Sequence, residues 1–110
     1  MPRGDLLGSL EYIVLLALVR LGPEAYGMTV RREIEKRVGR NLSIGAVYAT
    51  LDRLEAKGFV SSTVGEPTAA RGGRAKRHFR MEADGERALK ASEDAIRRMS
   101  AGLRRHWGNA

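Results

Sequence analysis

The sequence predicts a mainly α-helical fold that carries one two-stranded β-hairpin. Three stretches within the first 57 residues, and a fourth near the C-terminus, repeat apolar residues at helical spacing. Between the third and the fourth stretch, two short segments alternate as β-strands do. A chain of 110 residues with 43% apolar residues is large enough for one compact unit with its own core.

The first helix is expected over residues 5–21, where apolar residues cover most of the helix circumference. Gly22-Pro23 should end this helix, because proline cannot continue the hydrogen-bond ladder. A domain of this size offers few internal neighbours to such an apolar helix. The pattern therefore indicates burial against a second subunit.

The second helix is expected at about Tyr26–Val38 and should end at Gly39. The third is expected at about Ser43–Lys57, with Ser43 as its N-cap and Gly58 at its end. A short turn joins the two. The predicted inward stripe of the third helix consists of Ile44, Val47, Leu51 and Leu54, with Tyr48 at its edge.

The outward face of the third helix is expected to carry small residues, Gly45, Ala46, Ala49 and Thr50, followed by Arg53. A solvated helix face normally carries long charged side chains, so small residues favour close approach to a large anionic partner. Within this set, Thr50 and Arg53 have the reach and polarity to contact base edges.

The two strands are expected at Phe59–Val64 and Lys76–Met81, joined by the eleven residues of Gly65–Ala75. The stretch Ala70–Arg80 holds five Arg or Lys residues and no acid, in a chain whose net charge is +7. Such a concentration of charge indicates a polyanionic partner such as nucleic acid. The alternative is a solvated basic surface.

A last helix is expected over residues 83–106, where Leu89, Ile96, Met99 and Leu103 form a heptad-like seam. This seam predicts a helical contact with a second subunit, although it could also pack on the core of its own subunit. The chain is accordingly divided into a DNA-binding domain, residues 1–82, and a C-terminal dimerisation helix, residues 83–110.

Three helices followed by a hairpin with a basic loop are typical of a winged helix-turn-helix, in which the hairpin is called the wing. In this fold the third helix enters the major groove of DNA, and the wing lies near the phosphate backbone. Tyr48 could donate its hydroxyl to a phosphate or be a half-buried core residue. The predicted DNA-binding residues of the third helix are Ser43, Gly45, Ala46, Tyr48, Ala49, Thr50 and Arg53. Those of the wing are Arg71, Gly72, Gly73, Arg74, Lys76 and Arg77.

Four segments resemble the PadR family of transcriptional regulators. They read LLGSLEYIVLLALVRLG, AYGMTVRREIE, SIGAVYATLDRLEAKGFV and GGRAKRHFRMEADGE, and they cover nearly the whole chain in register. The sequence departs from the family pattern at three places. Ala49 replaces a frequent proline, His78 replaces an aromatic residue, and Glu82 replaces a threonine before the last helix, which leaves the N-cap to Glu82 or Asp84.

The resemblance implies a dimeric repressor that binds near-palindromic double-stranded DNA, often beside its own gene, with the first and last helices building the dimer. The residues expected at that interface are Leu10, Ile13, Val14, Leu89, Ile96, Met99 and Leu103. Some family members bind flat aromatic effectors between the subunits, where Trp107 could stack on the ligand. The alternative for Trp107 is a terminal aromatic that covers a dimer edge or is simply exposed.

Other function classes find little support. An enzyme, a metal or a cofactor is not expected, because neither His78 nor His106 has a second ligand at metal spacing and no catalytic motif accompanies them. The chain has no cysteine, and its longest apolar run, Tyr12–Val19, is too short to cross a membrane. A cytoplasmic protein without a signal peptide is therefore expected. The alternatives are an interaction or architectural winged helix, and an RNA binder, which would usually expose aromatic residues.

Overall fold

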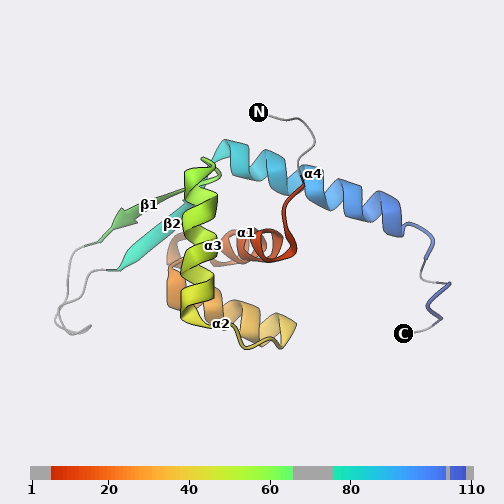
Figure 1. The fold of residues 1–110 in the computed structure, drawn as a ribbon, viewed down its shortest axis with the longest axis horizontal. Coiled ribbons are helices and arrows are strands. Elements are labelled where there is room, and N and C mark those ends of the chain that lie inside the picture. Colours follow the sequence, from red (N-terminus) through yellow and green to blue (C-terminus); the bar gives the residue numbers. More distant parts are fainter. Residues whose placement is uncertain (1–5, 66–75, 104, 109–110) are drawn as a thin grey trace.

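The computed structural model describes residues 6–65, 76–103 and 105–108. It confirms the mainly α-helical fold with a two-stranded antiparallel wing (Figure 1). The elements in chain order are α1 (Ser9–Leu21), the 3-10 helix η1 (Gly22–Glu24), α2 (Gly27–Val38), α3 (Ile44–Ala56), β1 (Val60–Val64), β2 (Arg77–Met81) and α4 (Ala83–Ser100).

The ends of α2 and α3 are set by the residues that the sequence indicated. Gly39 has a φ of 79° and Gly58 also has a φ of 79°, a left-handed conformation that favours glycine. At the start of α3, the Ser43 hydroxyl accepts a hydrogen bond of 3.0 Å from the Ala46 amide, as an N-cap does.

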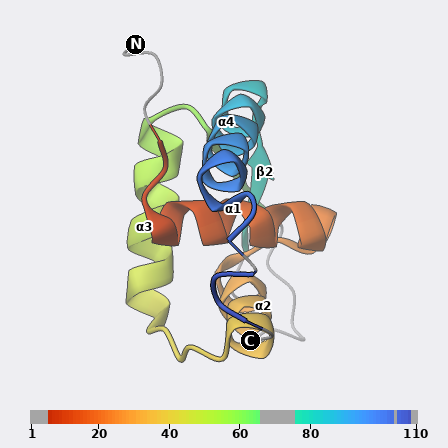
Figure 2. The same cartoon turned by 90° about the vertical axis from the view of Figure 1, so that its right-hand side faces the viewer.

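The core lies between α1, α2 and α3 and extends to the wing and to the first half of α4. In Figure 2, α1 crosses in front of α3 with α2 below it. The expectation that Ile44 faces inward is wrong, because the residue is 36% exposed. The buried apolar residues are Val14, Leu15, Ala17, Leu18, Ala25, Val30, Ile34, Val47, Leu51, Leu54, Val60, Phe79 and Leu89.

The wing is joined to the helices at its base. Strands β1 and β2 pair so that Ser62 lies opposite Phe79, and the Phe79 amide donates to the Ala25 carbonyl over 2.9 Å. Phe79 is 3% exposed, so the strand closest to the helices contributes its aromatic ring to the core. The wing is therefore fixed to the entry of α2 at its base.

Helix α4 packs on α1 with its first half and projects from the three-helix body with its second half (Figures 1 and 2). Ser92 is 2% exposed, and its hydroxyl accepts a hydrogen bond of 3.0 Å from the Leu7 amide. Glu82 is the N-cap residue of α4, without a capping bond from its side chain. Asp84 instead pairs with Arg87.

The last helix is shorter than expected, since α4 ends at Ser100 rather than His106. Ala101 leaves the helical conformation with a ψ of 131°, and Gly102 follows with a φ of 81°. Glycine is a poor helix former, which accounts for the early end. None of the described helices has the length and apolarity that a membrane crossing requires.

Two residues expected at a dimer interface lie inside the subunit instead. Val14 is fully buried and Leu89 is 7% exposed, because both belong to the core of their own chain. Placing them at the interface was therefore wrong. Leu10 and Ile13 are half-buried, while Ile96, Met99 and Leu103 are 51%, 81% and 37% exposed. The part of the seam available to a second subunit is the part beyond Ser92.

Candidate nucleic-acid interface

Helix α3 presents a face of small residues to the solvent. Gly45 and Ala49 are exposed, Ala46 is half-buried, and the N-cap Ser43 is exposed beside them. An added Cβ at Gly45 would have only the Ser43 hydroxyl near it, at 4.0 Å. Nothing in the described part of the chain covers this face closely, so a rigid partner could approach the α3 backbone there.

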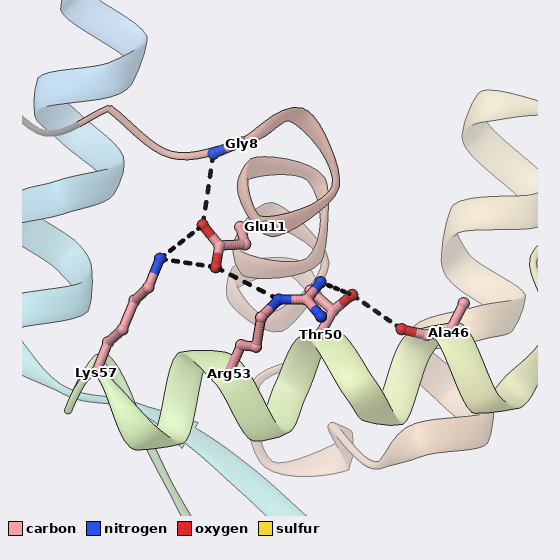
Figure 3. Close-up of polar contacts among 6 residues, drawn as sticks. All are labelled: Gly8, Glu11, Ala46, Thr50, Arg53 and Lys57. Atoms are coloured by element: carbon pink, nitrogen blue, oxygen red, sulfur yellow. Dashed lines mark hydrogen bonds and ion pairs between the residues drawn. The ribbon is translucent and has the colours of Figure 1, made fainter.

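Thr50 does not belong to this face, and its assignment to base readout is wrong. The residue is fully buried, and its hydroxyl donates to the Ala46 carbonyl over 2.8 Å. Its position lies on the flank of α3 that turns toward α1 (Figure 3). A side chain that returns its hydroxyl to its own helix is not available to a base edge.

Arg53 lies on the same flank and remains accessible, with 57% of its side chain exposed. Its guanidinium donates to the Thr50 hydroxyl over 3.2 Å, and its Nε lies 4.0 Å from a carboxylate oxygen of Glu11. Lys57, one turn further along α3, lies 2.9 Å from the same carboxylate. Both cations of the α3 surface are thus oriented by one acid of α1.

Tyr48 packs on the start of α2. A Cβ added to Gly27 would lie 2.4 Å from the Tyr48 ring, so only glycine leaves room for the ring in this position. Tyr48 is half-buried against the core. Tyr48 is therefore a half-buried residue packed against the core, as one of its two expected roles requires. A phosphate contact through its hydroxyl stays a prediction.

The wing residues Arg71, Gly72, Gly73 and Arg74 lie outside the described residues. Lys76 immediately precedes β2 and lies over the Tyr26 ring, with its ammonium 3.8 Å from the ring centroid. Its ammonium also donates to the Tyr26 hydroxyl over 2.6 Å. The cation is therefore held at the base of the wing, beside the entry to α2.

Arg77 is engaged by α3. Its guanidinium lies 3.0 Å from the Asp52 carboxylate and also pairs with Glu55, while 34% of the side chain is exposed. The Ser62 hydroxyl and the Arg77 guanidinium both donate to Glu55 and hold the pKa of its carboxyl below the usual value, against the opposing effect of burial. Arg77 thus links the wing to α3, and its phosphate contact stays a prediction.

Four participants were not found from the sequence: Glu11, Asp52, Glu55 and Tyr26. Glu11 had a visible signal, since it is the one acid inside the apolar first helix. Asp52 and Tyr26 had none, because their partners are 25 and 50 residues away along the chain. Within the described ranges, no group of three His, Asp or Glu side chains could hold a metal ion.

Trp107 lies in a turn beyond α4 and is 57% exposed. One subunit does not enclose its ring, so a planar ligand stacked on it would need further walls from a second subunit. The effector role of Trp107 therefore stays a prediction.

The model of the transcriptional regulator PadR-like family matches residues 15–91. The fold is similar to that of a PadR family transcription regulator from Clostridium difficile, with a TM-score of 0.69 and 23% identity over 88% of this chain and 99% of the other. A PadR-like transcriptional regulator from Bacillus cereus gives a TM-score of 0.72 and 17% identity over 90% and 91%. A winged-helix DNA-binding protein from STIV gives 0.68 and 19% over 89% and 98%.

No curated protein sequence gives a significant match. The family match runs from the middle of α1 through α2, α3 and the wing to the first half of α4, and so covers most of the winged helix described above. The chain belongs to the PadR-like family of transcriptional regulators, which are DNA-binding winged-helix proteins and not enzymes.

Proposed function

We propose that the protein is a homodimeric repressor that binds a near-palindromic operator beside its own gene or a neighbouring operon. The observation that carries this proposal is the surface formed by α3 and the base of the wing. The small-residue face of α3 lies open, Arg53 flanks it on one side, and Arg77 joins it to the wing on the other.

The chemistry of this surface suits duplex DNA. A small-residue face lets a helix enter the major groove closely, and Arg53 can donate two hydrogen bonds to a guanine edge. Cations of the wing suit the phosphate backbone, where they displace counterions. In this proposal the contacts come from Ser43, Gly45, Ala46, Tyr48, Ala49, Arg53, Lys76 and Arg77, with Arg71, Gly72, Gly73 and Arg74 of the loop.

Dimerisation is proposed to occur through the projecting half of α4. Its exposed apolar side chains, Ile96 and Met99, are followed by Leu103 after the helix end. Such large apolar groups on a projecting helix favour burial against a like surface. The half-buried Leu10 and Ile13 of α1 could extend that contact. In this division residues 1–82 bind DNA and residues 83–110 serve dimerisation.

A dimer of this kind should read two half-sites separated by one helical turn, about 34–36 Å. Selection of duplexes from a randomised library by the purified protein tests this directly. The proposal expects an enriched inverted repeat with half-sites roughly 10 bp apart, and transcription from a promoter that carries it should fall when the protein is present. Enrichment of no sequence would instead favour an architectural or interaction module.

A further inference from the structure

Glu11 is an acid buried at the junction of α1 and α3. The residue is 8% exposed, and its carboxylate accepts a hydrogen bond of 3.4 Å from the Gly8 amide. The Lys57 ammonium lies 2.9 Å from one carboxylate oxygen and 3.2 Å from the other. The buried carboxylate is thus paired with the Lys57 ammonium where α1 meets the end of α3.

The same carboxylate begins a chain of contacts that runs along α3 (Figure 3). The Arg53 Nε lies 4.0 Å from it, and another nitrogen of the guanidinium donates to the Thr50 hydroxyl over 3.2 Å. Thr50 in turn donates to the Ala46 carbonyl over 2.8 Å. The Arg53 guanidinium is thus hydrogen-bonded to Thr50 and lies at ion-pair distance from Glu11.

Holding Arg53 in this way has a consequence for recognition. A long arginine side chain is flexible in water, and ordering it on a base opposes binding. A guanidinium held in advance loses less freedom when it forms a pair of hydrogen bonds. More than half of the Arg53 side chain remains exposed, so the held group is still accessible to a ligand.

We propose that Glu11 is a positioning residue for DNA recognition, which acts through Arg53 by holding its guanidinium at the edge of α3 where it contacts a base. Lys57 balances the remaining charge of the carboxylate. The inference rests on the proposed function, because it requires a duplex that the protein prefers. The alternative is that Glu11 only neutralises the charges of Arg53 and Lys57. In that case Glu11 weakens binding to every duplex equally.

The substitution Glu11→Gln separates the two roles. Glutamine keeps the size of the side chain and its acceptor for the Gly8 amide, and it removes the charge that attracts Arg53. Fluorescence anisotropy is measured on a duplex selected by the wild-type protein and on a scrambled duplex of equal composition. The preference for the selected duplex should fall roughly tenfold, a fraction of what a bidentate arginine contact contributes. Affinity for the scrambled duplex should stay equal or rise.

Glu86→Gln is the matched control, since it changes the net charge equally at an exposed position of α4. This control should leave the preference unchanged. If Glu11→Gln raises the affinity for both duplexes by the same factor, or changes neither, the positioning role is wrong.

A double-mutant cycle tests whether Glu11 acts through Arg53. In the background of Arg53→Ala, the change Glu11→Gln should alter the preference less than about twofold, because its target is absent. An equal loss in both backgrounds would show that Glu11 acts by another route and would overturn the proposal.

Two further readouts keep the test decisive. If Glu11→Gln does not fold, Thr50→Val removes the other anchor of Arg53 and should lower the preference in the same way, whereas an unchanged preference would contradict the proposal.

If the wild-type protein itself enriches no duplex and prefers none, the proposed operator binding fails and the role of Glu11 fails with it. If the wild type discriminates and Glu11→Gln discriminates equally, only the role of Glu11 fails.

Discussion

The guanidinium of Arg77 on β2 lies 3.0 Å from the carboxylate of Asp52 on α3. It also pairs with Glu55, which lies one turn further along the same helix. The wing and α3 are therefore joined by one cation between two acids. Asp52 is 59% exposed in its side chain and lies next to the small-residue face, so this pairing also neutralises an acid close to the proposed DNA surface.

Replacing Arg77 by Ala should weaken binding to all duplexes alike, because it exposes the charges of Asp52 and Glu55 to the phosphates. It should also lower the free energy of unfolding by about 1 kcal/mol, the scale of a partly exposed ion pair. Adding Asp52→Asn to Arg77→Ala should recover part of the affinity. The affinity measurements use anisotropy, and the stability measurements use urea. If the second change recovered nothing, the neutralising role of Arg77 would be contradicted.

Lys76 provides the contrast to Arg77. Since its ammonium pairs with a tyrosine rather than with an acid, Lys76→Ala should reduce the slope of log affinity against log salt by about one, as loss of one phosphate contact does. A slope equal to that of the wild type would place Lys76 outside the DNA contact.

The pairing of Glu55 predicts an acid-sensitive contribution to stability. Because the folded pKa of Glu55 lies below its ordinary value of 4.5, the unfolded chain binds a proton first as the pH falls. The stabilisation is thus fully present above 4.5 and is lost as the pH falls through the lower folded value. Urea unfolding between neutral and acidic pH should show a shallower decline in Glu55→Gln than in the wild type. Identical declines would remove Glu55 as the cause.

Gly85 in the first turn of α4 makes the closest backbone approach among the glycines described. A Cβ there would lie 2.2 Å from the carbonyl oxygen of Phe59, which cannot move as a side-chain end could. Gly85→Ala should therefore destabilise the fold by about 2 kcal/mol, despite the better helix propensity of alanine. Gly45→Ala is the matched control and should stabilise by up to about 1 kcal/mol. Equal effects of the two changes in urea unfolding would contradict the close packing.

The exposed seam of α4 predicts the oligomeric state. Ile96→Glu combined with Met99→Glu should give a folded monomer, because both side chains are exposed within one subunit and would meet only a partner. Lys90→Glu, on the opposite side of α4, changes the net charge by the same amount and should leave a dimer. Sedimentation equilibrium distinguishes the two states. A dimer that persists in the double variant would place the interface elsewhere.

Much of the fold could be predicted from residues that act on the backbone next to them. Ser43, Gly39 and Gly58 act on the backbone of their own helices, so the ends of α2 and α3 could be predicted within a residue, whereas α1 begins at Ser9 and not at the expected residue 5. Thr50 could not be placed, because it stands at the border of the inward stripe and its burial depends on where α1 crosses. The end of α4 was also missed, since a heptad pattern continued to Leu103 beyond the break at Gly102.

The candidate site shows a similar division. The small-residue face of α3 could be read from helical spacing alone. The partners of Arg53 and Arg77 could not, because Glu11, Asp52 and Glu55 are brought to them by tertiary packing. Val14 and Leu89 could not be placed correctly, because an apolar pattern does not indicate whether the residues pack on their own subunit or on a second one.

The proposed function depends on sequence-specific binding of duplex DNA by the surface of α3 and the wing. The most direct measurement is fluorescence anisotropy of the protein on the DNA upstream of its own gene and on a scrambled duplex, across a series of salt concentrations. We expect a preference for the upstream site of about 10³ or more, with affinity that falls steeply as salt rises. Equal binding to both duplexes at every salt concentration, or no binding even at low salt, would contradict it.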